Sequence, residues 1–204
     1  MLKNDRWIKE QAAKGMIEPF VPEMVRDVPS DNAYGEIQYD PVLSFGTGSY
    51  GYDTRLSLRE FLIFRHVPGT VMNPKRFNPA NLEPVPLQED GDGRFFILPA
   101  HSYGLGVALE KLRVPSYITV VCLGKSSYAR LGIIVNTTPA EAGWQGHLTL
   151  EFSNSSGADC RIYADEGVCQ LLFFEGDPCE TTYADRLGGG KYMHQPEKVV
   201  TSLV

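Results

Sequence analysis

The sequence lacks the residue patterns that define several large classes of protein. Its four cysteines form no Cys-x-x-Cys pair, so neither a zinc ribbon nor a thioredoxin-type redox centre is indicated. No apolar run reaches the roughly 20 residues that a membrane-spanning helix needs, and no signal-peptide pattern is present. We therefore expect a cytoplasmic protein that does not enter a membrane and whose thiols are free.

The chain also lacks an excess of positive charge. Lys and Arg number 19 against 25 Asp and Glu, which gives a net charge of −6 and a pI near 5.2. Proteins that bind nucleic acid gain much of their affinity from basic surfaces that neutralise phosphates, so a nucleic-acid partner is not expected. A ligand rich in negative charge would have to be held by a small local group of cations.

Length and composition predict one folded domain that covers residues 1–204. A hydrophobic content of 43% with 11% aromatic residues is enough for a packed core. The patterns favour a mainly β fold that begins with one short helix, capped by Asn4 or Asp5 and ended by Gly15. We expect loops with short strands over residues 19–45, a surface excursion over 68–93, strands at 60–64, 94–98, 103–109 and 168–174, and a turn at 110–115.

The stretch from Tyr117 to Asn154 is the most organised part of the chain. Three β-type runs enclose one charged turn, and from Leu148 onward apolar and polar residues alternate. The alternation places Thr149 and Glu151 on the polar face of a strand, opposite Leu150 and its apolar neighbours. A carboxylate on a strand is well placed to act as a reacting group. The pattern alone is equally consistent with an exposed surface glutamate.

The charged turn begins at Gly124. It combines Lys125, two serine hydroxyls and Arg130 within a few residues, which suits a phosphate-rich ligand. It is not a Walker A loop, because Thr119 stands where that motif needs its first glycine and a β-run follows. Residues 46–51 fit Gly-x-Gly-x-x-Gly, but a strand pattern follows and His66 stands near the offset of the expected acidic residue, so no dinucleotide site is predicted.

Three motifs and a tail segment follow one another along the chain. They are Gly-Lys-Ser-Ser-Tyr-Ala-Arg-Leu-Gly-Ile from Gly124, Gly-Trp-Gln-Gly from Gly143, Thr-Leu-Glu-Phe-Ser-Asn from Thr149, and Lys-Tyr-x-x-Gln ending at Gln195. In combination they resemble the dCTP deaminase family of the trimeric dUTPase superfamily. The resemblance covers nearly the whole chain. It implies a distorted jelly roll or dUTPase-like β-barrel, and a homotrimer with sites at the subunit interfaces.

The pattern of zinc-dependent deaminases is missing from the chain. Those enzymes need His-x-Glu and Pro-Cys-x-x-Cys, but no histidine here is followed two residues later by Glu, and Thr182 stands where the second cysteine would follow Pro178-Cys179. The resemblance therefore implies zinc-independent hydrolysis of dCTP to dUTP and ammonia, a step toward dUMP and dTTP. Acid–base catalysis would do the work.

The resemblance also implies residue roles. Glu151 would move protons between water and the base, Ser126 and the carbonyl near Pro139 would hold the water, and Arg130 would orient Glu151. Mg²⁺ would enter only on the substrate triphosphate, and the chain would provide no metal ligands of its own. The tail, residues 183–204, would close over the nucleotide. The residues expected to contact substrate are Lys125, Ser126, Ser127, Tyr128, Ala129, Arg130, Thr149, Leu150, Glu151, Gln170, Tyr183, Lys191 and Gln195.

Several alternatives stay open at this point. Gln170 is alternatively explained by a structural hydrogen bond to a neighbouring backbone. In related dUTPases an Asp at the place of Asp53 helps to hold the metal–triphosphate, but a hydrogen bond at a turn or strand end explains Asp53 as well. The chain is alternatively a dUTPase, a bifunctional deaminase and dUTPase, or a non-catalytic jelly-roll protein that binds nucleotides or assembles. The dUTPase alternative, which releases pyrophosphate, requires an Asp before the turn at Gly143, and Glu141 is the nearest carboxylate there. Feedback by dTTP is a further possibility that the resemblance raises.

Overall fold

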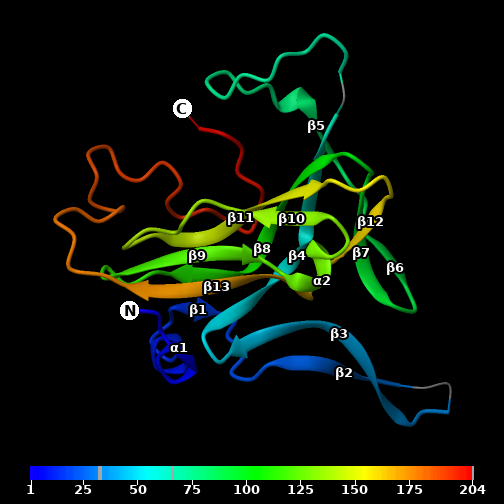
Figure 1. Cartoon of the computed structure of the whole chain (residues 1–204), viewed down its shortest axis with the longest axis horizontal. Helices are drawn as coiled ribbons and strands as arrows, with labels where there is room; N and C mark the ends of the chain where they lie inside the picture. The colour runs from blue at the N-terminus through cyan, green and yellow to red at the C-terminus, as the bar shows by residue number, and fades with distance from the viewer. Residues whose placement is uncertain (32–33, 66, 204) are drawn as a thin grey trace.

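The computed structural model describes residues 1–31, 34–65 and 67–203, and antiparallel strands dominate it (Figure 1). The mainly β prediction is thus confirmed. The elements are α1 Asp5–Ala12, β1 Ile17–Glu18, β2 Val25–Asp31, β3 Ile37–Gly48, β4 Gly51–Phe64, the 3-10 turn η1 Pro79–Asn81, β5 Leu82–Pro84, β6 Gln88–Asp90, β7 Gly93–Leu98, β8 Tyr103–Arg113, β9 Ile118–Gly124, α2 Ser126–Ala129, β10 Ile133–Asn136, β11 Gln145–Asn154, β12 Cys160–Tyr163 and β13 Gly167–Glu175.

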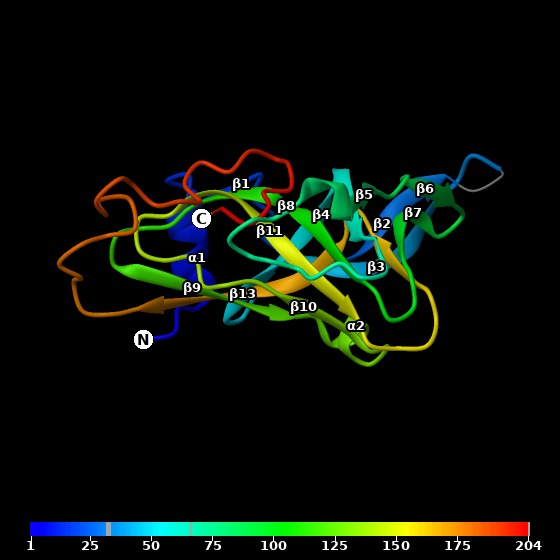
Figure 2. The same cartoon turned by 90° about the horizontal axis from the view of Figure 1, so that it is seen from above.

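The main sheet runs in the order β10-β11-β8-β4-β13-β9, with β1, β2, β3 and β5 joined to it. A smaller sheet has the order β12-β7-β6. Neighbours in the main sheet are mostly distant in sequence, as in a distorted jelly roll. The two views show an elongated molecule, with the β2–β3 hairpin projecting at one end and the orange segment after β13 at the other (Figures 1 and 2).

The predicted N-terminal helix is confirmed as α1. The side chain of Asn4 accepts a hydrogen bond from the Trp7 N–H at 3.2 Å, which caps the first turn. Ile8 and Ala12 are buried against the sheet. Gly15 has a φ of +86°, a left-handed conformation that turns the chain away toward β1.

The glycine-rich segment 46–51 closes a β-hairpin. Gly48 pairs with Gly51, so the two residues between them make the turn from β3 into β4. The rejection of a dinucleotide-binding loop is confirmed, because β4 follows where a helix would be needed. His66, which stands near the expected acidic position, lies outside the described residues.

Three local predictions were wrong. Residues 19–45 contain long strands, because Pro29 and Pro41 sit within the β2–β3 hairpin, where an edge position tolerates proline. Residues 110–113 continue β8 and do not form a turn. The charged turn after Gly124 contains one helical turn, α2, before β10 begins.

The continuation of β8 buries a carboxylate. Glu110 is fully buried and accepts hydrogen bonds from the Tyr52 and Thr54 hydroxyls. It also accepts from the backbone N–H and the Nε of Arg55, at 2.9 and 2.8 Å. Arg55 continues the network to Asp165, where its Nη1 lies 3.3 Å from a carboxylate oxygen. Every oxygen of the buried group is therefore paired, as a buried charge requires.

We predict that Glu110→Ala destabilises the fold strongly. Removing one partner of a buried pair leaves the other charge uncompensated, which costs about 3–5 kcal/mol. Glu89→Ala, at an exposed position in β6, is the control and should change little. Chemical denaturation of both variants tests this, and equal midpoints for the two would refute the importance of the network.

Candidate active site

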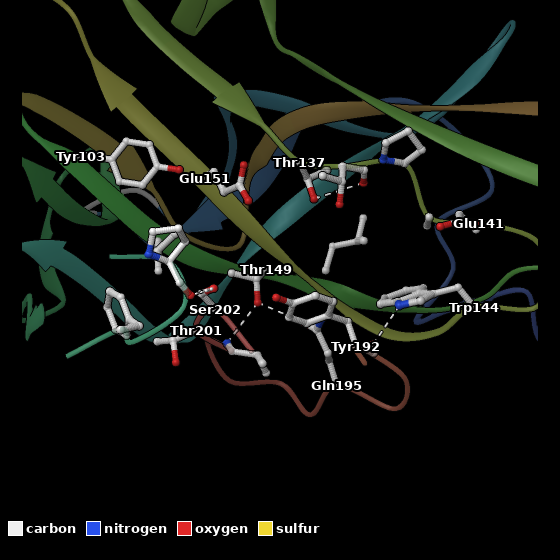
Figure 3. Close-up of a pocket in the computed structure, with 18 of the residues that line it drawn as sticks. Tyr103, Thr137, Glu141, Trp144, Thr149, Glu151, Tyr192, Gln195, Thr201 and Ser202 are labelled. Atoms are coloured by element: carbon white, nitrogen blue, oxygen red, sulfur yellow. Dashed lines mark hydrogen bonds between the residues drawn. The ribbon is translucent and has the colours of Figure 1, made fainter. Parts of the chain in front are cut away.

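A cavity of about 760 Å³ opens on the polar face of β11 (Figure 3). β8 and β11 form one side, residues 137–144 form a second, and Phe64 with Met72, Asn73, Pro74 and Phe77 forms a third. The C-terminal tail covers the remainder with residues between 183 and 202. The sequence therefore places a half-enclosed space directly over the strand predicted to carry the reacting group.

Glu151 points into this cavity from β11, as predicted. Burial alternates residue by residue along β11, with Leu150 and Phe152 completely buried on the opposite face. The pairing register sets Glu151 beside Asn136 of β10 on one side and Leu105 of β8 on the other. The Asn136 side-chain amide donates to Oε2 of Glu151 at 3.2 Å.

The surroundings of Glu151 favour its protonated form. Burial raises the pKa of the Glu151 carboxyl above its ordinary value, and the hydrogen bond from Asn136 lowers it in part. Burial and the negative charge of Glu151 together raise the pKa of Tyr103 to about 12, so Tyr103 stays protonated. A carboxyl whose pKa is raised is a stronger base once it is ionised.

The tail is docked against β11 by several hydrogen bonds. The Thr149 hydroxyl donates to Oε1 of Gln195 at 3.0 Å, and the His147 N–H donates to the Gln195 carbonyl at 3.0 Å. The Trp144 indole N–H donates to the carbonyl of Tyr192 at 2.8 Å. Thr149, Gln195 and Tyr183, three of the residues predicted to bind substrate, all line the cavity.

A second cluster of predicted residues lies on β4, β9 and β13. Lys125 forms an ion pair with the buried Asp53, and Nε2 of Gln170 donates to the same carboxylate at 3.1 Å. The strand register brings these three side chains together. Asp53 of β4 is opposite Gln170 of β13, and Gly124, which precedes Lys125, is opposite Cys169, which precedes Gln170. Gln170 is therefore satisfied by a side chain of its own chain, as the structural alternative expected.

The exposed part of this cluster is the segment around α2. Ser126, Ser127, Ala129 and Arg130 are exposed, and Arg130 forms no ion pair within the described part of the chain. The expected contact of Arg130 with Glu151 is not made in one chain. Glu151 is level with Asn136, the far end of β10 is three residues or about 10 Å away, and Arg130 lies beyond it.

Three residues predicted to contact substrate do not present their side chains to the cavity. The side chains of Tyr128 and Leu150 are buried, and the Tyr128 hydroxyl accepts the Tyr163 N–H at 2.8 Å. Only the backbones of Tyr128 and Leu150 are available to a ligand. Lys191 is exposed on the tail and does not line the cavity.

The cavity has no cation of its own. Among the described residues, neither Lys nor Arg nor His lines it. The carboxylate and the cations predicted to serve one substrate thus occupy two separate places on a single chain.

Glu141 lies in the same cavity as Glu151. Its carboxylate pairs with Arg186 of the tail, and the guanidinium of Arg186 stacks 4.9 Å from the centre of the Tyr183 ring. Sequence reasoning missed Arg186, Tyr103 and Asn136 as parts of this site. Tyr103 and Asn136 stand at strand ends, and their approach to Glu151 depends on pairing that no local pattern reveals.

No metal cluster is preformed within the described ranges. No group of three or more His, Cys, Asp or Glu side chains there is placed to hold a metal ion. The four cysteines are free thiols, with Cys122 and Cys169 buried. Over the same residues, no helix is long and apolar enough to cross a membrane.

We predict that Glu151→Gln gains stability relative to the native protein as the pH rises. The folded-state pKa of Glu151 is raised, so the folded protein holds a proton that the unfolded chain releases, and the native protein loses stability as pH rises above the unfolded-state pKa. Gln does not ionise and escapes this loss. Thermal unfolding at pH 4 and pH 7 measures the effect, with the exposed Glu180→Gln as control. A constant difference between native and Glu151→Gln at both pH values would contradict it.

Comparison with known proteins assigns the chain to a family. Residues 2–176 match the model of the family described as dCTP deaminase-like. The proteins named dCTP deaminase from Halorhodospira halophila (strain DSM 244 / SL1) and Dechloromonas aromatica (strain RCB) are 47% and 48% identical over 196 residues, which is 95% of each chain.

A solved structure shares the fold. The crystal structure of 2′-deoxycytidine 5′-triphosphate deaminase from Agrobacterium tumefaciens aligns with a TM-score of 0.51 at 17% identity, over 86% of this chain and 48% of that one. At this identity the similarity speaks for the fold alone. From the family model and the near full-length relatives together, the chain belongs to the dCTP deaminase-like family.

Proposed function

We propose that this protein is an enzyme that hydrolyses dCTP to dUTP and ammonia. The observation that carries the proposal is Glu151, a half-buried carboxyl with a raised pKa on the cavity face of β11. Near full-length relatives named dCTP deaminase support the choice of substrate.

Glu151 would serve as both base and acid. Its carboxylate removes a proton from water while the water oxygen attacks C4 of cytosine, and the proton passes to N3. The tetrahedral adduct then loses its amino group as ammonia after a second proton transfer, and the C4 carbonyl of dUTP forms. Such acid–base help contributes about 10²–10⁴-fold. Water and dCTP are consumed and dUTP and ammonia are produced, with no redox change and no zinc-bound water.

A second copy of the chain would complete the site. No cation among the described residues lines the cavity around Glu151, whereas dCTP carries a triphosphate, and Lys125, Ser126, Ser127 and Arg130 lie elsewhere on the same chain. Placing the α2 segment of one copy over the cavity of the next brings both halves to one substrate. Repetition of this unlike contact closes as a ring, and we propose the homotrimer.

Within that assembly the α2 segment has several tasks. Ser126 and the carbonyl near Pro139 would hold the attacking water, and Arg130 would orient Glu151. Lys125 and Ser127 would bind phosphates, with Lys125 held in place by Asp53. Mg²⁺ would arrive on the triphosphate as part of the substrate.

The tail would close the site. Tyr183 and Gln195 already line the cavity, and the exposed Lys191 between them is free to reach a phosphate when the tail adjusts. A dTTP molecule has the same sugar and triphosphate as dCTP. Feedback by dTTP at this site therefore remains part of the proposal.

We predict that the native protein releases ammonia from dCTP and leaves the triphosphate intact. Glu141 is engaged by Arg186 and is not free to activate a second water at the α-phosphate. Glu151→Gln should keep nucleotide binding and lose at least about 10²-fold in turnover, while Glu180→Gln should match the native protein. An ammonia assay, calorimetry and anion-exchange chromatography of the products measure these outcomes.

Each rival outcome has a distinct result in that experiment. Appearance of dUMP with pyrophosphate would make the enzyme bifunctional and point to Glu141. Binding of dCTP without ammonia release would identify a non-catalytic nucleotide-binding protein. Normal turnover by Glu151→Gln would remove Glu151 from the mechanism.

We also predict that two inactive variants complement each other. Glu151→Gln and Arg130→Ala should each be inactive alone. After co-refolding in equal amounts, sites that take Glu151 from one copy and Arg130 from another recover, giving roughly a quarter of native activity for random assembly around a closed ring. Absence of any recovery in verified mixed oligomers would place both residues in a site within one chain.

A further inference from the structure

Tyr103 and Glu151 project from neighbouring strands into the same cavity. Tyr103 is opposite Ser153 in the β8–β11 register, and Glu151 is opposite Leu105. Opposed residues of an antiparallel pair share one face, so Tyr103 is the diagonal neighbour of Glu151 on the cavity side. Diagonal neighbours lie within reach of aromatic and long side chains. Figure 3 shows the hydroxyl end of Tyr103 directed toward Glu151.

The ring of Tyr103 is held in place by an aromatic wall. It packs edge-on against Phe64 with ring centres 5.1 Å apart, and Phe64 packs in the same manner against Phe77 at 6.2 Å. The wall fixes the plane of the ring and leaves the hydroxyl at the cavity. Tyr103 remains 36% exposed.

Both groups have unused hydrogen-bonding capacity. Among the described residues, the Tyr103 hydroxyl has no hydrogen-bond partner, and Glu151 has one, the Asn136 amide at Oε2. No hydrogen bond reaches Oε1 of Glu151 from the described residues. The two side chains are thus diagonal neighbours that are not bonded to each other.

Few other charged groups face Glu151. The titratable side chains that line the cavity are Tyr103 on β8, Glu141 after β10, and Tyr183 and Tyr192 on the tail. Glu141 is neutralised by Arg186. The strand β10 presents Asn136, which does not titrate, and Phe64, Met72, Asn73, Pro74 and Phe77 present apolar and amide groups. Among the described lining residues, Tyr103 is the diagonal neighbour of Glu151 that carries a hydroxyl without another partner.

We propose that Tyr103 is a positioning residue for Glu151, whose hydroxyl donates a hydrogen bond to Oε1 once the nucleotide base fills the cavity. This inference rests on the proposed deamination. Asn136 from β10 and Tyr103 from β8 then hold the carboxylate from both sides and aim it at C4. The bond stabilises the ionised carboxylate, which is the form that removes a proton from water.

The test compares pH profiles of native, Tyr103→Phe and Phe77→Leu proteins with dCTP. Tyr103→Phe keeps the ring in its wall and removes only the hydroxyl. Because a donor to the ionised form is lost in the bound state, we expect the acid limb of kcat to move up by about one pH unit and kcat to fall about tenfold. The acid limb of kcat/KM, which reports the free enzyme, should not move.

Phe77→Leu separates positioning from packing. It loosens the aromatic wall but leaves the hydroxyl, so stability or KM should change while the acid limb of kcat stays in place. If the native protein releases ammonia but Tyr103→Phe has the same pH profile as the native protein, the inference about Tyr103 is wrong while the proposed function stands. If the native protein releases no ammonia from dCTP, the proposed function falls and the inference falls with it.

Discussion

The pairing of β11 between β10 and β8 is the constraint on which the rest of the site depends. A strand alternates its side chains between two faces, so a slip of one residue would bury Glu151 and expose Leu150. The same register determines that Asn136 and Tyr103 flank the carboxylate. Catalytic geometry and core packing are therefore fixed by one set of backbone hydrogen bonds.

The chain treats two glutamates of neighbouring strands in opposite ways. Glu110 is fully buried, with every oxygen satisfied and a guanidinium beside it, and it serves the fold. Glu151 is half-buried with one amide partner, so its ionisation is unfavourable in the isolated chain. The difference lies in the number of hydrogen-bond donors that each strand position provides to its carboxylate.

Local patterns predicted what depends on local physics. The cap at Asn4, the alternation around Glu151 and the strand that follows Gly51 were all visible in the sequence as periods or capping residues. The predictions failed where the structure depends on pairing between residues that are distant in sequence. Glu110 was expected in a turn because no local sequence pattern indicates that Tyr52, Thr54 and Arg55 are its partners. Likewise, sequence spacing could not reveal that Asp53 engages Lys125, or that α2 lies away from the Glu151 cavity.

The docking of the tail gives the protein a way to report occupancy. Gln195 contacts the cavity strand, whereas Leu187 is fully exposed and Gly188 and Gly189 have open space around them. A ligand that binds only when Gln195 is docked must, by linkage, stabilise the docked tail by the same free energy that docking adds to its binding. Protease cleavage near Leu187 would then slow as the cavity fills, so the exposed glycine-rich segment would report from a distance whether the cavity is occupied.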